Sequence, residues 1–237
     1  MRRMPTLVLT IAGAAVMAVV TAVGASAAGF LGPGHFSTTV ADANAQWFSS
    51  SPFVMVSADR NTFVFRPSHH GGAPIVQHAT ILFVTVQSPT MFGQDCFVIP
   101  DSAFVQSNGV QDASVNVTVD ATDLCPGFAT PLAGVITDAG GGPPPGGGGL
   151  PLPLTVNLTW TGNGVTSSNV DTSRSACGGF NSENHNSMTS AIASVNGTIV
   201  FGDGSVLTLS NPDFAQSDAG TFSSEIQGSP NPLCYGI

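Results

Sequence analysis

The chain has 237 residues, of which 42% are hydrophobic and 8% are charged, and its formal net charge is −9. It contains no lysine, and 14 acidic residues outnumber five arginines. A surface of this sign repels phosphate backbones and anionic headgroups, which argues against nucleic acid as a partner.

The first 27 residues have the composition of a secretory signal peptide. Arg2 and Arg3 form a basic start, residues 7–20 form an apolar run, and residues 25–27 (Ala-Ser-Ala) match a cleavage signature. Cleavage there leaves a chain with three arginines and 14 acidic residues, a net charge of −11 with neutral histidines. The alternative is an uncleaved membrane anchor, because the apolar stretch is nearly long enough to span a bilayer. We expect a secreted or extracellular protein, at the cell surface or in the periplasm as further options, with no membrane span after cleavage.

The mature sequence is organised as strands and turns. Residues 28–49 are expected to form a lead-in, and within them residues 40–48 are the one stretch with a helical pattern. Residues 53–56 and 62–65 are apolar runs on either side of an expected turn at 59–61. Residues 81–86 form a β-branched and aromatic run, which is typical of a buried strand.

Two later segments alternate apolar and polar residues with the period of a half-buried strand. They are residues 113–120 and 154–161, and we expect them to be antiparallel neighbours with Trp160 in the core. The strongest hairpin signal is Gly202-Asp203-Gly204-Ser205 between two apolar runs, because Asp-Gly supplies the positive φ of tight turns. Residues 222–226 are the last expected strand.

About ten short strands with regularly spaced turn signals predict an all-β sandwich or barrel-like domain. We expect one domain over residues 50–237, interrupted by a flexible Gly/Pro-rich loop at residues 139–153. The alternative is that this Gly/Pro-rich segment is a linker between two smaller domains.

Four cysteines remain after the signal segment, and none forms a C-x-x-C pair. An even number in an exported chain predicts disulfides. Folding the chain back about Gly109 brings Cys96 close to Cys125, which predicts the pairs Cys96–Cys125 and, by elimination, Cys177–Cys234.

Two blocks of the sequence resemble a family of exported bacterial β-rich proteins that has no assigned function. They are residues 114–119 and the V-x-L-T-W-T-G-x-G pattern of residues 156–164, followed later by an Asp-Gly hairpin. The resemblance covers about residues 50–228, implies a secreted β domain, and brings no catalytic or binding residue with it.

Three groups of residues are candidates for chemistry. His69, His70 and His78, with Asp59, form the histidine cluster in which a zinc or copper site would lie, although their spacing matches no metal motif. Glu183 and Glu225 are the two glutamates on which glycan hydrolysis would depend, since glycosidases need a carboxylate pair. The third group consists of aspartates in turns that could give oxygen ligands to calcium: Asp120, Asp123 and Asp203.

No motif for nucleophilic catalysis or for a cofactor is present, so we expect no catalytic residues and no cofactor. The sequence therefore favours a non-enzymatic exported module that binds an unidentified extracellular ligand or surface, or that has a structural role. A secreted glycan hydrolase and an extracellular metal-binding protein are the alternatives.

Overall fold

The computed structural model describes residues 34–48, 52–68, 73–88, 92–125, 149–177 and 180–227. These residues form ten strands, all paired antiparallel, and one short 3-10 turn, η1 (Asp101–Ala103). The strands are β1 (Gly34–Trp47), β2 (Phe53–Pro67), β3 (Ile75–Gln87), β4 (Phe92–Val98), β5 (Phe104–Ser107), β6 (Asp112–Val119), β7 (Leu154–Cys177), β8 (Phe180–Val200), β9 (Val206–Ser210) and β10 (Phe214–Gln227). The predicted all-β fold is confirmed. Within the described ranges, no helix has the length and apolar character needed to cross a membrane.

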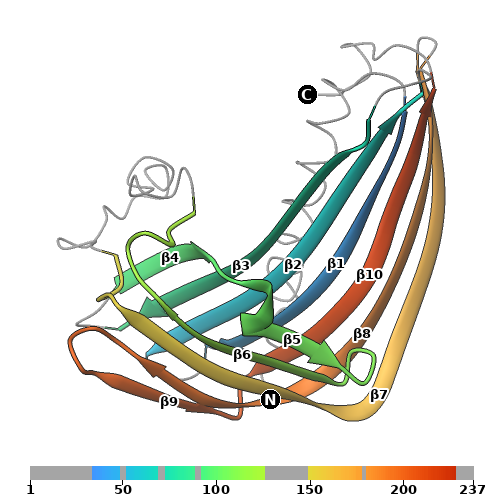
Figure 1. The fold of residues 1–237 in the computed structure, drawn as a ribbon. Helices are drawn as coiled ribbons and strands as arrows, with labels where there is room; N and C mark the ends of the chain where they lie inside the picture. Colours follow the sequence, from blue (N-terminus) through green and yellow to red (C-terminus); the bar gives the residue numbers. More distant parts are fainter. Residues whose placement is uncertain are drawn as a thin grey trace, which may run out of the picture.

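A single sheet holds all ten strands, in the order β4-β3-β2-β1-β10-β8-β7-β6-β5, with β9 paired to β8. Figure 1 shows that the sheet folds over on itself in its lower half, so that β5, β6, β9 and the start of β7 lie across β1 to β4. We call this two-layered half the sandwich. Beyond it the six strands β3, β2, β1, β10, β8 and β7 continue as one layer, which we call the blade: residues 75–80, 61–67, 34–40, 220–227, 180–191 and 165–177.

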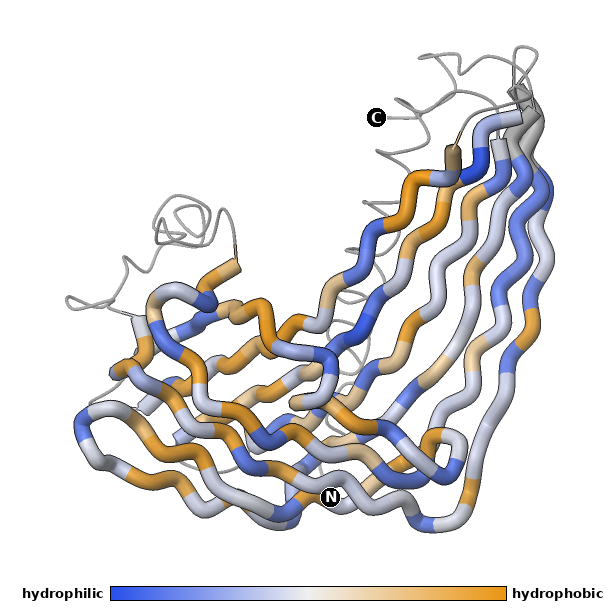
Figure 2. The backbone as a smooth tube through the Cα atoms, in the orientation of Figure 1, coloured by the Kyte–Doolittle hydropathy of each residue, from blue (hydrophilic) through white to orange (hydrophobic). Residues whose placement is uncertain are grey.

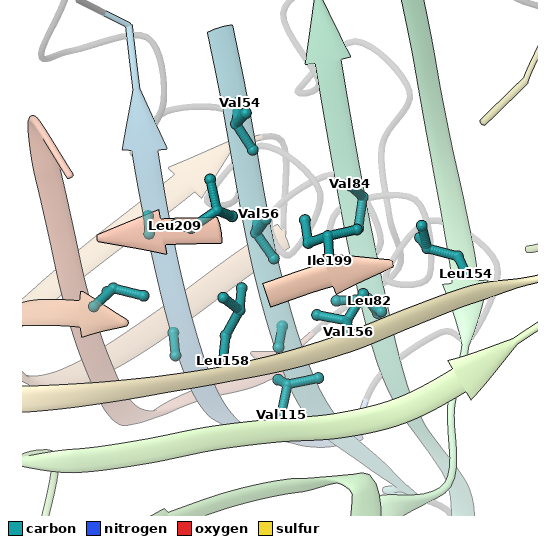
Figure 3. Close-up of a cluster of buried hydrophobic side chains, with 14 of the residues drawn as sticks. Val54, Val56, Leu82, Val84, Val115, Leu154, Val156, Leu158, Ile199 and Leu209 are labelled. Carbon is teal, nitrogen blue, oxygen red and sulfur yellow. The ribbon is translucent and has the colours of Figure 1, made fainter. Parts of the chain in front are cut away.

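The sandwich encloses the apolar core. Figure 3 shows aliphatic side chains of the two layers pointing towards each other, among them Val56 and Leu82 from one layer and Val156 and Leu158 from the other. Both tryptophans join the layers by hydrogen bonds, since Trp160 Nε1 donates to the carbonyl of Asn44 (2.9 Å) and Trp47 Nε1 to that of Ser210 (2.9 Å). Trp160 is completely buried, which confirms its predicted core position.

Several predicted pairings are confirmed. Strands β6 and β7 are antiparallel neighbours, with Val115 opposite Leu158 and Val119 opposite Leu154. The β5–β6 hairpin turns at Asn108-Gly109, where both residues have positive φ (51° and 71°). The Asp-Gly hairpin joins β8 and β9, and Gly204 adopts the positive φ (83°) that the turn requires.

Strand β7 passes from the sandwich into the blade through a bulge. Its pairing with β8 shifts between Gly162 and Thr166, so that residues 163–165 stand opposite the single residue Ile192. Gly164 has φ 83°, and its N–H donates to Oε1 of Gln111, in the turn before β6 (2.9 Å). The alternation that predicted this strand covers only residues 154–161, but β7 continues to Cys177 because the bulge redirects the strand without ending it.

Two further expectations need correction. Residues 34–47 were placed in the lead-in, with helical character from residue 40, yet they form β1 between β2 and β10. The turn expected at residues 59–61 is absent, because β2 runs unbroken from Phe53 to Pro67.

The end of the Gly/Pro-rich segment is fixed to the sandwich, although the segment was expected to be flexible throughout. Leu150 belongs to the core, its N–H donates to Asp95 Oδ2 (2.6 Å), and the carbonyl of Pro151 accepts from the N–H of Gly202 (3.0 Å). Residues 139–148 lie outside the described residues.

A turn was wrongly predicted in β2 because the side of the strand that is buried changes along its length. In β1 the buried residues are Ala43, Ala45 and Trp47 in the sandwich, but Phe36, Thr38 and Val40, on the opposite face, in the blade. Strand β2 changes side in the same way between Ala58 and Phe63. The apolar alternation therefore slips by one residue within a continuous strand, which looks like a break in the sequence.

Candidate functional site

Rows of polar residues cross the blade on the face that continues from the sandwich core. Figure 2 shows that β7 and β8 are largely hydrophilic here, whereas hydrophobic segments are frequent in the sandwich. One row consists of four side-chain hydroxyls on adjacent strands, which we call the hydroxyl row: Thr62, Thr39, Thr221 and Ser187. Three of the four are exposed and Thr62 is half-buried. The row places hydrogen-bonding groups at the regular spacing of the strands, about 4.8 Å.

A second row carries charges nearer the end of the blade and brings together the two glutamates that the sequence singled out. Glu225 is the registered partner of Glu183, and the row continues to His35 and Arg66 on one side and to Arg174 on the other. Glu183 accepts from Arg174 Nη2 (3.1 Å) and lies 3.4 Å from His185 Nε2. The hydrogen bond from Arg174 lowers the pKa of Glu183. A general acid needs a raised pKa, so Glu183 has the wrong environment for that role in glycan hydrolysis.

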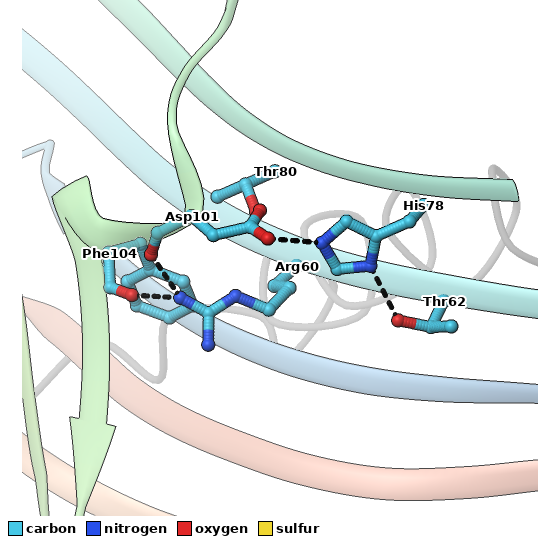
Figure 4. A network of polar contacts seen from close by, with 6 residues as sticks. All are labelled: Arg60, Thr62, His78, Thr80, Asp101 and Phe104. Carbon is cyan, nitrogen blue, oxygen red and sulfur yellow. Dashed lines mark hydrogen bonds and ion pairs between the residues drawn. The ribbon is translucent and has the colours of Figure 1, made fainter.

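A third polar group lies where the second layer of the sandwich ends (Figure 4). Asp101 of η1 accepts from Thr80 Oγ1 (2.6 Å) and contacts His78 Nε2 (2.7 Å), while His78 Nδ1 lies 2.6 Å from Thr62 Oγ1. With the hydrogen on Nε2, the imidazole donates to Asp101 and accepts from Thr62. The hydrogen bonds from Thr80 and His78 lower the pKa of Asp101.

Arg60 completes this group and ties η1 to the sheet. Its Nη2 donates to the carbonyls of Asp101 and Phe104, and its guanidinium lies over the Phe104 ring, 5.5 Å from the centroid. Since both nitrogens of His78 already have partners, a metal could bind there only after the imidazole had released one of them. His69 and His70 lie outside the described residues, and among the described ones no three His, Cys, Asp or Glu side chains are grouped closely enough to hold a metal ion.

The opposite face of the sheet carries a row of three aspartates that sequence reasoning missed as a group. Asp42 of β1 is the registered partner of both Asp59 of β2 and Asp218 of β10. The row below consists of Ser57, Asn44 and Gln216.

Each residue of the lower row donates to the aspartate two positions away on its own strand. Asn44 Nδ2 donates to Asp42 (3.1 Å), Ser57 Oγ to Asp59 (2.7 Å) and Gln216 Nε2 to Asp218 (2.6 Å). The sequence signal was a pair of polar residues two positions apart, one of them Asp, repeated in three strands. These pairs become a row only when the strand register is known.

Burial changes the ionisation of this aspartate row. Asp42 is 4% exposed, and desolvation followed by the charge of Asp59 raises its pKa well above the ordinary value. Desolvation is also the largest cause of the raised pKa values of Asp59 and Asp218. Two adjacent carboxyl groups of this kind retain a proton between them more readily than exposed aspartates do. Such groups can act as acids or bases, but a substrate would have to reach a side chain that is almost completely covered.

The three aspartates that were candidates for calcium binding accept hydrogen bonds within their own turns. Asp120 accepts from the N–H and hydroxyl of Thr122, Asp203 does the same for Ser205, and Asp123 accepts from the N–H of Asp120. These three aspartates therefore stabilise turns, as Asp commonly does.

The predicted Cys96–Cys125 disulfide is present, with a Cα–Cα distance of 5.3 Å. Cys177 ends β7, and its proposed partner Cys234 lies outside the described residues, so that pair stays a prediction.

Comparison with known proteins assigns no function. No family model matches the chain, and no curated protein does. Among solved structures, a Nitrosomonas europaea protein described as a candidate AttH matches with a TM-score of 0.31 and 9% identity, over 84% of this chain and 52% of that chain. The enduracididine biosynthesis enzyme MppR, with HEPES buffer bound, matches with a TM-score of 0.25 and 7% identity, over 86% of this chain and 89% of that one. Similarities at this level carry no argument about activity.

Proposed function

We propose that this chain is an exported, non-enzymatic β-rich protein that binds an extracellular ligand or surface through the polar face of the blade. The observation that carries the proposal is the hydroxyl row and the charged row, which lie on registered positions of a face that the second layer does not cover. Hydroxyl, imidazole, guanidinium and carboxylate groups together suit a ligand rich in hydrogen-bonding groups, such as a polysaccharide.

Export is supported by the basic start, apolar run and Ala-Ser-Ala sequence of the first 27 residues. The Cys96–Cys125 disulfide supports it too, because disulfides persist in oxidising compartments. The family resemblance of residues 114–119 and 156–164 points the same way.

The hydrolase alternative receives less support from the geometry. The environment of Glu183 favours its ionised form, and the aspartates with raised pKa values lie on the other face of the sheet. A metal-binding role would need His69 and His70 to join a histidine that already has two partners.

The test is a glycan-array and pull-down screen with the purified protein, with and without added divalent metal. The double variant T39V/T221V removes two exposed hydroxyls and keeps β-branched side chains, so it should lose binding while it stays folded. The matched control is T159V, because Thr159 is an exposed threonine on the outer side of the sandwich. Binding that survives in T39V/T221V, or that T159V abolishes equally, would refute the role of the hydroxyl row. Turnover of a bound glycan would refute the non-enzymatic assignment.

A further inference from the structure

The two outermost strands of the blade have backbone edges that no described strand covers. Strand β6 pairs with β7 only as far as Thr161, and β4 pairs with β3 only from Ile81 onward. Among the described residues, therefore, residues 166–174 of β7 pair only with β8, and residues 75–79 of β3 pair only with β2. Such an edge presents unpaired N–H and C=O groups to any strand that can align with it.

Both edges also expose apolar side chains. Val165 and Val170 on β7 are 67% and 75% exposed, and Ile75 and Val76 on β3 are 41% and 59% exposed. Natural edge strands are commonly protected by lysine, proline or inward-pointing charges. Residues 75–79 contain no lysine, proline or carboxylate, so this protection is missing from the β3 edge. Residues 166–174 contain no lysine or proline but include Asp171 and Arg174, so the β7 edge is protected only in part.

The directions of the two edges are compatible with each other. The blade has six strands, each antiparallel to its neighbour, so β7 runs opposite to β3. A second copy in the same orientation would therefore bring its β3 antiparallel to β7 of the first copy. This contact is heterologous and leaves one free edge at each end, so further copies can add.

One register brings the exposed valines of the two edges together. If Val170 pairs with Val76, the two valines meet on the polar face and Ser168 lies opposite His78. On the other face the amides of Asn169 and Gln77 meet, and Asp171 lies opposite Ile75 at the end of the contact. The faces agree because Val170 and Val76 both lie on the side that continues from the sandwich core.

We propose that copies of this chain associate head to tail through the blade, with residues 167–171 of β7 pairing with residues 75–79 of β3 of the next copy. The net negative charge opposes this contact, so added salt should strengthen it by screening the repulsion. The proposal goes beyond ligand binding and does not depend on it.

Sedimentation velocity of the purified protein over a range of concentrations tests the proposal. The wild type should show an average mass that rises with concentration without a fixed upper limit. V170D and V76K should each weaken association roughly tenfold or more, because a charge must then be buried against valine. Mixing the two variants should restore association, since the carboxylate introduced in one copy then meets the ammonium group introduced in the next.

The matched control is I192K, because Ile192 is 64% exposed but lies on β8, inside the sheet. It should associate like the wild type.

Circular dichroism and thermal melting identify any variant that fails to fold. A double variant with Val170→Cys and Val76→Cys then tests the register, because it should form a crosslink between copies. A wild type that stays monomeric, an I192K variant as weak as V170D, or an unrestored mixture of folded variants would overturn the proposal. T39V/T221V leaves both edges intact, so failure of this inference and failure of the proposed ligand face are distinguishable.

Discussion

The sandwich and the blade are made from the same long strands, yet they bury different sides of them. In the sandwich, β1 buries Ala43, Ala45 and Trp47 against a second layer, and the other side of the strand holds Asp42 and Asn44. In the blade the same strand buries Phe36 and Val40 on the opposite side and presents His35 and Thr39 outward. A single strand can thus serve a conventional core in one half and an open polar face in the other.

This difference indicates which half should contribute more to the stability of the fold. The sandwich contains most of the large fully buried side chains, the tryptophan hydrogen bonds between layers and the disulfide. The blade has an aromatic group of its own, but it has no second described layer over its polar face. Substitutions in the sandwich should therefore change global stability, and substitutions on the polar face should change binding.

The largest effect is expected at the centre of the sandwich. W160A removes a fully buried ring and a hydrogen bond between the layers, and should cost about 3–5 kcal/mol of unfolding free energy. V170A on the blade should stay within about 0.5 kcal/mol of wild type. Urea denaturation of both variants measures this, and equal losses would show that the two halves contribute alike.

The disulfide gives the next effect. C96A/C125A opens a link between residues 29 positions apart, and should lower stability by about 2–4 kcal/mol. Unreduced peptide mapping of the wild type must first show the Cys96–Cys125 peptide. A Cys96–Cys177 or Cys96–Cys234 peptide would contradict the strand arrangement.

A substitution in the aspartate row, unlike the two above, should raise the stability of the protein. The raised pKa of Asp42 means that folding favours its protonated form. The contribution of Asp42 to the free energy of unfolding is therefore fully present below the unfolded-state pKa and is lost as pH rises through the folded-state pKa. D42N removes the buried charge and should stabilise the protein at neutral pH by about 1–3 kcal/mol. Thermal melts from pH 4 to 8 should then show a smaller loss with pH in D42N. A wild type whose stability rises steadily over this range would contradict the assignment.

The smallest effect concerns the aromatic group of the blade. Phe36 lies between Phe63 and Phe222, with centroids 6.1 and 5.5 Å away. F36L keeps an apolar side chain and loses both ring contacts, which should cost about 1 kcal/mol. An unchanged denaturation midpoint would mean that these contacts do not stabilise the blade.

Much of the sandwich could be predicted from the sequence because its patterns are local. Alternation in residues 113–120 and 154–161 placed Trp160 inside, and Asn-Gly and Asp-Gly turns set two hairpins. The blade was missed because its evidence is not local. The burial of β1 and β2 changes side in mid-strand, and the Gly162-Asn163-Gly164 bulge resembles a strand end.

The candidate sites show the same limit. Glu183 and Glu225 were recognised as chemically interesting, but their adjacency depends on pairing between β8 and β10. Asp42, Asp59 and Asp218 come from three strands whose register no local pattern reveals. The partners of His78 were also hidden, because Asp101 reaches it from η1, 23 residues away along the chain.

Strand β7 offers the most direct test, because it contains both environments in one continuous segment. Its residues 154–161 lie between β6 and β8, while residues 166–174 pair with β8 alone among the described strands. Hydrogen exchange of the dilute protein, followed by mass spectrometry, compares the two halves. We expect the amides of residues 154–161 to exchange only through global unfolding and those of residues 166–174 to exchange much faster, through local opening. Equal protection along the whole strand would contradict the division into a stabilising sandwich and an open blade.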